Sequence, residues 1–340
     1  MTSPLMSTPG AVSAEFHDAG VAAHYGDPAH EGRAMERSSA WVDRSNRGVV
    51  RVSGPDRLGW LNDLTSQLTR GLAPGDATEA LILDGRGHLR HHLSLVDDGE
   101  ATWIHTEPGG GAALAAFLES MRFMLRVEVE DLSDARAVLT VLGPGRAEAI
   151  GAASLGDVPA RPAEDGTDLF LPAERLAGAA EALTAAGTRA AGMWAYEAQR
   201  IAGHRVRPGL DTDDRTIPHE VDWVGRAVHL EKGCYPGQET VARVHNMGRP
   251  PRRLVLLHLD GTAERLPEVG SPIELDGRAI GRVGTSARHH ELGPIALGVV
   301  KRSAPVDADL VVEGIAAGQE VVVDPDTGAN AQITLRRRPR

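Results

Sequence analysis

The sequence predicts an α+β fold, made of two related α+β units followed by a small β-barrel or sandwich. Two observations support this prediction. A short internal repeat places a strand, a Gly-Pro pair and a helix start in the same order at residues 50–57 and 139–146. After Pro250-Pro251, short strand-like runs alternate with Gly and Asp-Gly turns, and no helical pattern is evident up to about residue 335.

The first unit is expected to span residues 39–134. It begins with the strand-like run Val49-Val50-Arg51-Val52, after which Gly54-Pro55-Asp56 opens a helix with leucines at helical spacing. An Asp84-Gly85 turn then predicts a hairpin. The other elements expected here are strands at 81–83, 92–96, 102–105 and 127–130 and a helix at 112–121.

The second unit is expected at residues 135–249 and the barrel at 250–335. The second unit should contain strands at 139–142 and 168–171, a helix at 173–186, and a helix from Met193 to Ala202 that Gly203 closes as a left-handed cap. Residues 1–38, rich in Ser, Pro, Gly, Ala and His, are expected to be a loosely ordered lead-in. Residues 336–340 are read as a basic, solvated tail.

Composition excludes several classes of protein. The 340 residues are 41% hydrophobic and 24% charged, as in a globular protein that is soluble in water. A net charge of −11 argues against a broad nucleic-acid footprint. A single cysteine rules out a disulfide framework or a multi-cysteine metal cage within one chain and fits a reducing compartment. We find no secretory signal or membrane span, and expect a cytoplasmic protein.

One stretch concentrates the chemistry: Lys232-Gly233-Cys234-Tyr235-Pro236-Gly237-Gln238-Glu239. Its glycines and proline predict a rigid loop, and polar groups on such a loop are typical of a site. A nearby Lys232 ammonium would lower the pKa of the Cys234 thiol, making it a reactive thiol or a soft-metal ligand. No histidine within the motif offers a base for covalent catalysis. The alternative is a small buried cysteine.

Other polar residues near this loop are candidates for ligand binding. Gln238 and Glu239 can hydrogen-bond the edge of a heterocycle, or they can instead brace the loop. Arg200, Arg243 and Arg249 suit an anionic partner, although most surface arginines are merely solvated.

The histidines do not predict a metal site. The flanks of His88, His91 and His92 read as a hairpin, in which adjacent His91 and His92 point to opposite faces of the strand. The pair His289-His290 is interpreted in the same way. No Walker loop, GxGxxG turn, GxSxG elbow or HExxH motif is present.

The eight-residue loop, followed by Val241-Ala242-Arg243, resembles the K-G-C-Y-x-G-Q-E signature of the YgfZ-type folate-binding proteins. These form the iron–sulfur-linked branch of the glycine-cleavage T-protein (aminomethyltransferase) superfamily. Weaker matches extend the resemblance over about residues 40–335. They are Asp43-Arg44-Ser45 with Arg47-Gly48, residues 52–56, Arg200-Ile201 with Gly203, and Ile217-Pro218 with Glu220.

The resemblance implies a cloverleaf of two α+β domains and a C-terminal β-barrel around a central folate-binding hole. It implies binding of tetrahydrofolate or a derivative, and a role in assembling or repairing iron–sulfur clusters on client enzymes, tRNA-modifying ones among them. The implied binding residues are Arg200, Glu220, Lys232, Gly233, Cys234, Tyr235, Gly237, Gln238, Glu239 and Arg243.

Two departures from the catalytic branch argue against an aminomethyltransferase. That branch carries Gly-Gly-x-x-Asp-Asp-Leu in the first-domain hairpin, and matching Gly87 and Leu93 puts His91 and His92 where the aspartates stand. It also carries Leu-Arg-x-Glu-x-Gly, whereas residues 199–203 here read Gln-Arg-Ile-Ala-Gly and leave no carboxylate. Pterin recognition would then use other groups, such as Glu220 or Gln238.

Three functional hypotheses follow. The first is a folate-binding accessory protein of iron–sulfur maintenance, whose partners are client or assembly proteins, with no direct contact to nucleic acid or membrane. The second is a folate-dependent one-carbon transferase or demethylase in which His91 or His92 acts as the base. The third is a scaffold with a vestigial pocket.

Overall fold

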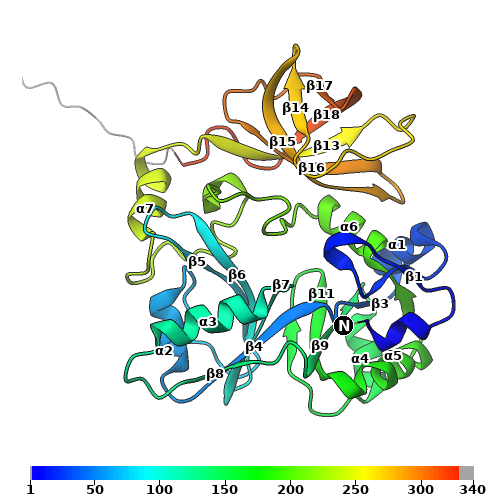
Figure 1. The fold of residues 1–340 in the computed structure, drawn as a ribbon, viewed down its shortest axis with the longest axis vertical. Helices are drawn as coiled ribbons and strands as arrows, with labels where there is room; N and C mark the ends of the chain where they lie inside the picture. The colour runs from blue at the N-terminus through cyan, green and yellow to red at the C-terminus, as the bar shows by residue number, and fades with distance from the viewer. Residues whose placement is uncertain (1, 329–340) are drawn as a thin grey trace, which may run out of the picture.

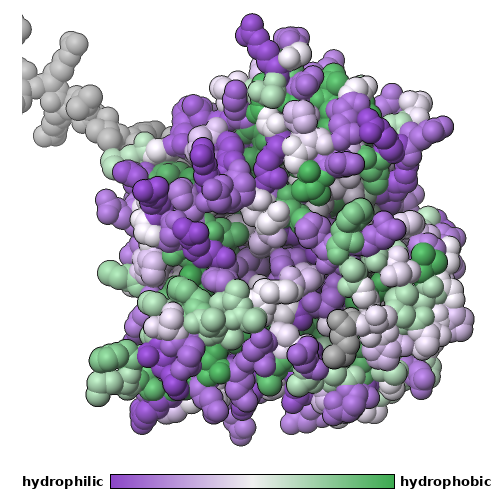
Figure 2. Space-filling view, viewed as in Figure 1, coloured by the Kyte–Doolittle hydropathy of each residue, from purple (hydrophilic) through white to green (hydrophobic). Residues whose placement is uncertain are grey.

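The computed structural model describes residues 2–328 of the chain. Two five-stranded sheets with their helices lie side by side, and a closed six-stranded barrel sits across them (Figure 1). This arrangement confirms the predicted fold class of two α+β units and a C-terminal barrel. On the face seen in Figure 2, hydrophobic residues form small separate patches among hydrophilic ones.

The first unit is a sheet with strand order β5-β6-β7-β4-β8. Helices α2 and α3 both pack on one face, because alternate strand residues such as Val50, Leu93 and Ile104 join Leu61 and Leu114 in one buried cluster. The elements are β4 (Arg47–Ser53), α2 (Arg57–Leu64), β5 (Ala77–Leu83), β6 (Leu89–Asp97), β7 (Ala101–Pro108), α3 (Gly111–Met121) and β8 (Glu128–Asp131).

The second unit repeats this plan with strand order β10-β11-β9-β3-β12. Its elements are β3 (Ala40–Asp43), β9 (Arg136–Leu142), α4 (Arg146–Ala153), β10 (Ala160–Pro162), β11 (Gly166–Pro172), η3 (Ala173–Arg175), α5 (Leu176–Ala185), β12 (Arg189–Ala191) and α6 (Met193–Ala202). Its open sheet face meets that of the first unit, where Val49 and Trp103 pack against Val138 and Phe170.

The internal repeat has a structural cause. Gly54 follows β4 and Gly143 follows β9, and both have a left-handed backbone, with φ of 102° and 98°. A Cβ at Gly54 would lie 2.1 Å from the carbonyl oxygen of Arg126, and one at Gly143 would lie 2.5 Å from that of Ser38. Only glycine fits either turn, so both copies carry Gly-Pro between the central strand and the helix.

The lead-in differs from its prediction. Residues 2–38 are ordered and contain η1 (Pro4–Ser7), β1 (Val12–Ser13), η2 (Phe16–Asp18), β2 (Ala22–His24) and α1 (Pro28–Arg37). The segment packs on the second unit, where Val21 and Met35 are buried with Val42. Glu31 is buried too and accepts hydrogen bonds from the amides of Tyr25 and Gly192. The first four elements are too short to show a hydrophobic period, and the buried side of α1 includes Glu31 and Gly32, so it carries little apolar signal in the sequence.

Two further details differ from the sequence reading. Strand β3 lies in the second sheet, between β9 and β12, although residues 39–134 were assigned to the first unit. Helix α6 has the predicted bounds, but Gly203 is not a left-handed cap, since its φ is −83°. The left-handed residue is the next one, His204, at φ 55°.

The barrel is closed by six antiparallel strands in the order β13-β16-β15-β14-β17-β18. They are β13 (Arg252–Leu259), β14 (Pro272–Leu275), β15 (Arg278–His289), β16 (Gly293–Lys301), β17 (Leu310–Val312) and β18 (Ile315–Val321). Between α6 and the barrel runs a connecting segment, residues 203–251, that contains η4 (Pro218–Glu220) and α7 (Gln238–Met247). The predicted tail at 336–340 lies outside the described residues.

Within residues 2–328, no helix is long and apolar enough to cross a membrane.

Candidate functional site

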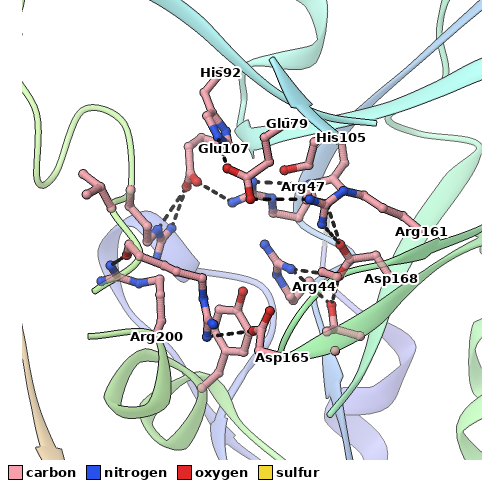
Figure 3. A pocket seen from close by; sticks show the side chains of 18 of the residues that line it. Arg44, Arg47, Glu79, His92, His105, Glu107, Arg161, Asp165, Asp168 and Arg200 are labelled. Atoms are coloured by element: carbon pink, nitrogen blue, oxygen red, sulfur yellow. Dashed lines mark hydrogen bonds and ion pairs between the residues drawn. The ribbon is translucent and has the colours of Figure 1, made fainter. Parts of the chain in front are cut away.

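A narrow pocket that opens to solvent lies where the two sheets face each other (Figure 3). Strands of both sheets, α6 and the connecting segment line it. On β6, His92 and Ser94 face the pocket while Leu93 points to the helices; on β7, His105 and Glu107 line it while Ile104 points to the helices. Because successive side chains of a strand point to opposite faces of the sheet, each sheet turns a polar face toward the pocket.

Asp168 on β11 is the most heavily bonded carboxylate of the pocket. Its Oδ1 accepts hydrogen bonds from Thr140 (2.7 Å) and Arg44 (3.2 Å), and its Oδ2 accepts from Arg161 and His105 (2.9 Å each). Burial alone would raise the pKa of Asp168, but His105, Arg44 and Arg161 outweigh burial and hold it well below its ordinary value. Asp168 is therefore ionised and fully paired.

His105 is neutral at neutral pH. Burial lowers its pKa to about 3, although Asp168 acts in the opposite direction. The neutral ring donates from Nε2 to Asp168, and its Nδ1 faces the guanidinium of Arg47 at 3.3 Å. The imidazole thus contacts a buried arginine through one ring nitrogen and a buried carboxylate through the other.

Glu79 and Glu107 are also held ionised. Glu107 pairs with Arg47 (2.6 Å) and Arg207 (3.0 Å), and Glu79 pairs with His92 (3.0 Å) and Arg161 (3.5 Å). Burial raises the pKa of each carboxyl, but these partners outweigh it and leave both pKa values well below the ordinary range. Neither group has the pKa near 7 that a general base needs.

Positive charge exceeds negative charge in the lining. Among the described residues, seven arginines and five carboxylates line the pocket, and every one of these carboxylates is ion-paired. The arginines are Arg44, Arg47, Arg161, Arg200, Arg205, Arg207 and Arg226, and the carboxylates are Asp18, Glu79, Glu107, Asp165 and Asp168. Tyr196 and Trp223 add aromatic side chains. Arg44 covers the Tyr196 ring and His92 stacks on Trp223, so the arginines are the groups through which the pocket suits a ligand, and that ligand is an anion.

Of the predicted binding residues, Arg200 lines this pocket. Its guanidinium is saturated by protein partners: Glu197 at 2.7 and 3.0 Å, Asp211 at 3.0 Å, the Arg205 carbonyl and the Thr285 hydroxyl. Arg200 therefore ties α6 to the connecting segment and to β15, with no hydrogen-bond donor left for a ligand.

Glu220 lies elsewhere. It is fully buried, accepts from Arg252 at 2.7 and 2.8 Å and from the Ile217 amide at 3.2 Å, and is not among the described residues that line the pocket. Arg252 begins the barrel and also pairs with Asp213. Glu220 thus joins the connecting segment to the barrel.

The predicted motif also lies outside the pocket lining. Within residues 2–328, none of its eight residues lines the pocket, and neither does Arg243. Lys232 is buried, and its ammonium donates to the carbonyls of Asn62, Thr65 and Gln67 at the end of α2. Burial lowers its pKa to about 8. An ammonium has three donors, and these carbonyls use all three, so none is left for Cys234.

The rest of the motif packs against the tip of the β5–β6 hairpin (Figure 1). Gly237 has φ 81°, and a Cβ there would lie 2.6 Å from the Asp84 carbonyl oxygen. Gln238 donates to the Lys232 carbonyl at 3.2 Å, and the Tyr235 ring is buried 5.0 Å from Lys232 Nζ. The exposed members are Gly233, Cys234, Pro236, Glu239 and, on α7, Arg243. A cofactor role for these residues stays a prediction.

Sequence reasoning placed two histidines correctly and missed most of the pocket. His91 lies against Phe117 and His92 stacks on Trp223 at 5.4 Å in the pocket, so the two do point to opposite faces. The missed residues are Arg44, Arg47, Glu79, His105, Glu107, Arg161 and Asp168. Their signal was present: apart from Arg44, which directly follows β3, each is a charged residue or histidine on the inward face of a strand, where an ordinary core would be apolar.

Comparison with known proteins agrees with this architecture. Residues 4–160 match the model of the GCVT N-terminal domain family. The crystal structure of glycine cleavage system aminomethyltransferase T from Bartonella henselae superposes with a TM-score of 0.80 over 96% of this chain and 98% of that one, at 19% identity. The chain therefore has the fold of that aminomethyltransferase, and residues 4–160 resemble the GCVT N-terminal domain.

The curated proteins that are similar to this chain carry different names. An aminomethyltransferase of Streptomyces coelicolor is 28% identical over 90% of this chain and 89% of its own length. An iron-sulfur cluster assembly factor IBA57 homolog, mitochondrial, of Mycosarcoma maydis is 28% identical over 70% of this chain and 62% of its own. A putative chloroplastic transferase of Arabidopsis thaliana is 23% identical over 83% and 69%. The proteins similar to this chain therefore include both proteins named as enzymes and one named as an assembly factor.

Proposed function

We propose that this chain is a tetrahydrofolate-binding accessory protein that supports the assembly or repair of iron–sulfur clusters in client enzymes, tRNA-modifying enzymes among them, in the cytoplasm. One observation carries the proposal: a pocket lined by seven arginines, Arg226 the most loosely paired of them, in which every lining carboxylate of the described chain is ion-paired. Such a pocket is built to bind an anion and lacks a free carboxylate for proton transfer.

A reduced folate fits this chemistry. Its pterin is a flat heterocycle with hydrogen-bonding edges, and its glutamate tail is anionic. Arg226 is the pocket arginine with the loosest pairing, since its nearest carboxylate is Glu79 at 3.6 Å. Its side chain is 34% exposed, so it can turn toward a ligand carboxylate.

The iron–sulfur half of the proposal rests on Cys234 and on the Mycosarcoma maydis relative, whose name is that of an assembly factor. Cys234 is exposed at the end of a loop that Lys232 and Gly237 hold in place. An exposed thiol on a rigid loop is accessible to a client protein or to a cluster in transfer. With one cysteine per chain, further cluster ligands must come from a partner or from free thiols.

Calorimetry with tetrahydrofolate on the purified full chain tests the binding half. We expect Arg226→Ala to weaken binding at least tenfold, a loss of about 1.4 kcal/mol, and Arg243→Ala on α7 to leave it unchanged. If Arg243→Ala weakened binding and Arg226→Ala did not, the ligand would bind at the motif. If neither the wild type nor any variant gave heat, folate binding would be refuted.

Complementation tests the thiol half. In a strain that lacks the gene, Cys234→Ala should fail to restore the activity of iron–sulfur enzymes while keeping tetrahydrofolate binding in vitro. Full rescue by the variant would show that the thiol is dispensable.

The second candidate function is a folate-dependent one-carbon transferase or demethylase. Its support is the aminomethyltransferase relatives and the position of His92, which lies in the pocket 3.0 Å from Glu79. Turnover of a methylamine donor with tetrahydrofolate, abolished in His92→Gln, would favour this function over the accessory role.

A further inference from the structure

Three metal-ligating side chains meet where helix α1 contacts the barrel. Glu36 comes from α1, and His289 and His290 come from the end of β15 and the turn that follows it. Among the residues that the structure describes, they form the one group of three whose ligand atoms all lie within 4.8 Å of one another. They are 253 and 254 residues apart in the chain, so only the fold brings them together.

The separations suit a small cation. His289 Nε2 lies 3.3 Å from Glu36 Oε1, and His290 Nε2 lies 3.1 Å from Glu36 Oε2. A tetrahedral zinc ion with bonds of 2.0–2.1 Å holds its ligand atoms about 3.3 Å apart. Two histidines and a carboxylate are also a donor set that zinc commonly takes, with the fourth position left to water.

The surroundings hold these groups in place. Gln199 on α6 donates to Glu36 Oε1 at 3.0 Å, which orients the carboxylate. Gly32 lies one turn before Glu36, and a Cβ there would come within 2.9 Å of His290 Nδ1, so the close approach of this ring depends on glycine. The two histidine side chains are 4% and 2% exposed, whereas Glu36 is 31% exposed and leaves an entry path from solvent.

One buried nitrogen is only weakly partnered. His289 Nε2 is buried, and its contact with Glu36 Oε1 at 3.3 Å is not aligned as a regular hydrogen bond. Its Nδ1 accepts the amides of Glu291 and Leu292 at 3.2 Å each, which places the proton of the neutral ring on Nε2. A cation would take the place of that proton, and one proton would be released.

We propose that Glu36, His289 and His290 bind a divalent cation of the zinc class, which fastens helix α1 to the barrel. The site is separate from the pocket, since none of the three lines it, and it is independent of folate binding. In this role the cation links the N-terminal segment, which packs on the second unit, to the C-terminal barrel, and thereby holds the two ends of the fold together.

The test uses the untagged full chain in a Cys234→Ser background, so that neither a tag nor the thiol contributes to binding. Titration with Co²⁺ should give the strong visible absorption of a four-coordinate ion, and Zn²⁺ should displace it at one ion per chain. Glu36→Gln and His290→Ala should each weaken binding at least tenfold. His258→Ala is the matched control, because it removes another barrel histidine that pairs with a single glutamate, Glu320, at 3.2 Å.

Thermal unfolding gives a second readout. Zn²⁺ should raise the Tm of the wild type and of His258→Ala, because a ligand that binds the folded state stabilises it, and it should leave Glu36→Gln unchanged. Circular dichroism without metal checks that Glu36→Gln is folded. Equal binding by all variants, or no bound ion at stoichiometric Zn²⁺, would overturn the proposal. The proposal would also be overturned if the difference in Tm between the wild type and Glu36→Gln were the same with and without Zn²⁺. The three groups would then form only an ion-paired contact.

Discussion

Replacing Asp168 with asparagine should destabilise the chain strongly, because this carboxylate is the common partner of two buried cations. Arg44 and Arg161 both bond to it, and the side chains of all three are less than 10% exposed. Asparagine keeps the shape but removes the charge. One oxygen can still accept hydrogen bonds, while the new NH₂ group faces donors and cannot.

The size of the effect follows from this geometry. Removing one partner of a buried ion pair leaves an uncompensated charge and typically costs about 3–5 kcal/mol. Glu79 lies 3.5 Å from Arg161 and compensates part of its charge, whereas Arg44 keeps Thr140 (3.1 Å) and the face of Tyr196 (4.7 Å). We therefore expect Asp168→Asn to lower the free energy of unfolding by about 3 kcal/mol, the low end of that range.

Urea unfolding at pH 7, followed by tryptophan fluorescence, measures the loss. Asp63→Asn is the control, since it breaks an ion pair to Arg70 in which both side chains are more than 60% exposed. Such pairs contribute less than about 1 kcal/mol. A loss for Asp168→Asn no larger than that of the control would refute the view that the pocket charges are mutually dependent.

Three further predictions test other parts of the argument. The free energy of unfolding of the wild type should fall as pH drops from about 6.5 toward 3. In this range His105 takes up a proton in the unfolded chain but not in the folded chain, where its pKa is about 3. Urea unfolding at several pH values should show a flatter dependence for His105→Gln. Lys232→Met should lower the free energy of unfolding by about 2–4 kcal/mol, since it strips three buried carbonyls of their donor, while Cys234→Ser should change it by less than about 0.5 kcal/mol. Gly237→Ala should lower the Tm by several degrees and Gly233→Ala should not, because only Gly237 has a positive φ and a crowded Cβ position; equal effects would contradict the packing role.

The fold was predictable where local rules and global structure agree. The repeated Gly-Pro turns at Gly54 and Gly143 were visible because a left-handed turn allows only glycine, and proline suits a helix start. The barrel could be predicted from the Gly and Asp-Gly turns between its short strands. By contrast, β3 joins the second sheet through pairing with β9, a contact across nearly 100 residues that no local pattern encodes.

The pocket was harder to predict for a physical reason. Asp168, His105 and Arg47 lie on three strands of two sheets, and their mutual pairing alone makes their burial tolerable. Read singly, each looks like an ordinary polar residue of an edge or hairpin. For His289-His290 only the expected strand alternation is wrong: His290 lies beyond the end of β15, so alternation does not separate the two rings, whose centroids lie 4.5 Å apart.

The conspicuous motif and the inconspicuous pocket are linked through the β5–β6 hairpin. Gly237 packs on the tip of that hairpin, whose strands carry Glu79 and His92 into the pocket, and Lys232 holds the end of α2 beneath the same sheet. The loop therefore fixes one wall of the pocket from outside while its other side presents Cys234 to solvent. Cys234 does not line the pocket, but the loop that carries it packs on the hairpin that forms one wall of the pocket. Because Gly237 is in close contact with Leu83, Asp84 and Gly87, a movement of the hairpin toward the loop would displace the loop.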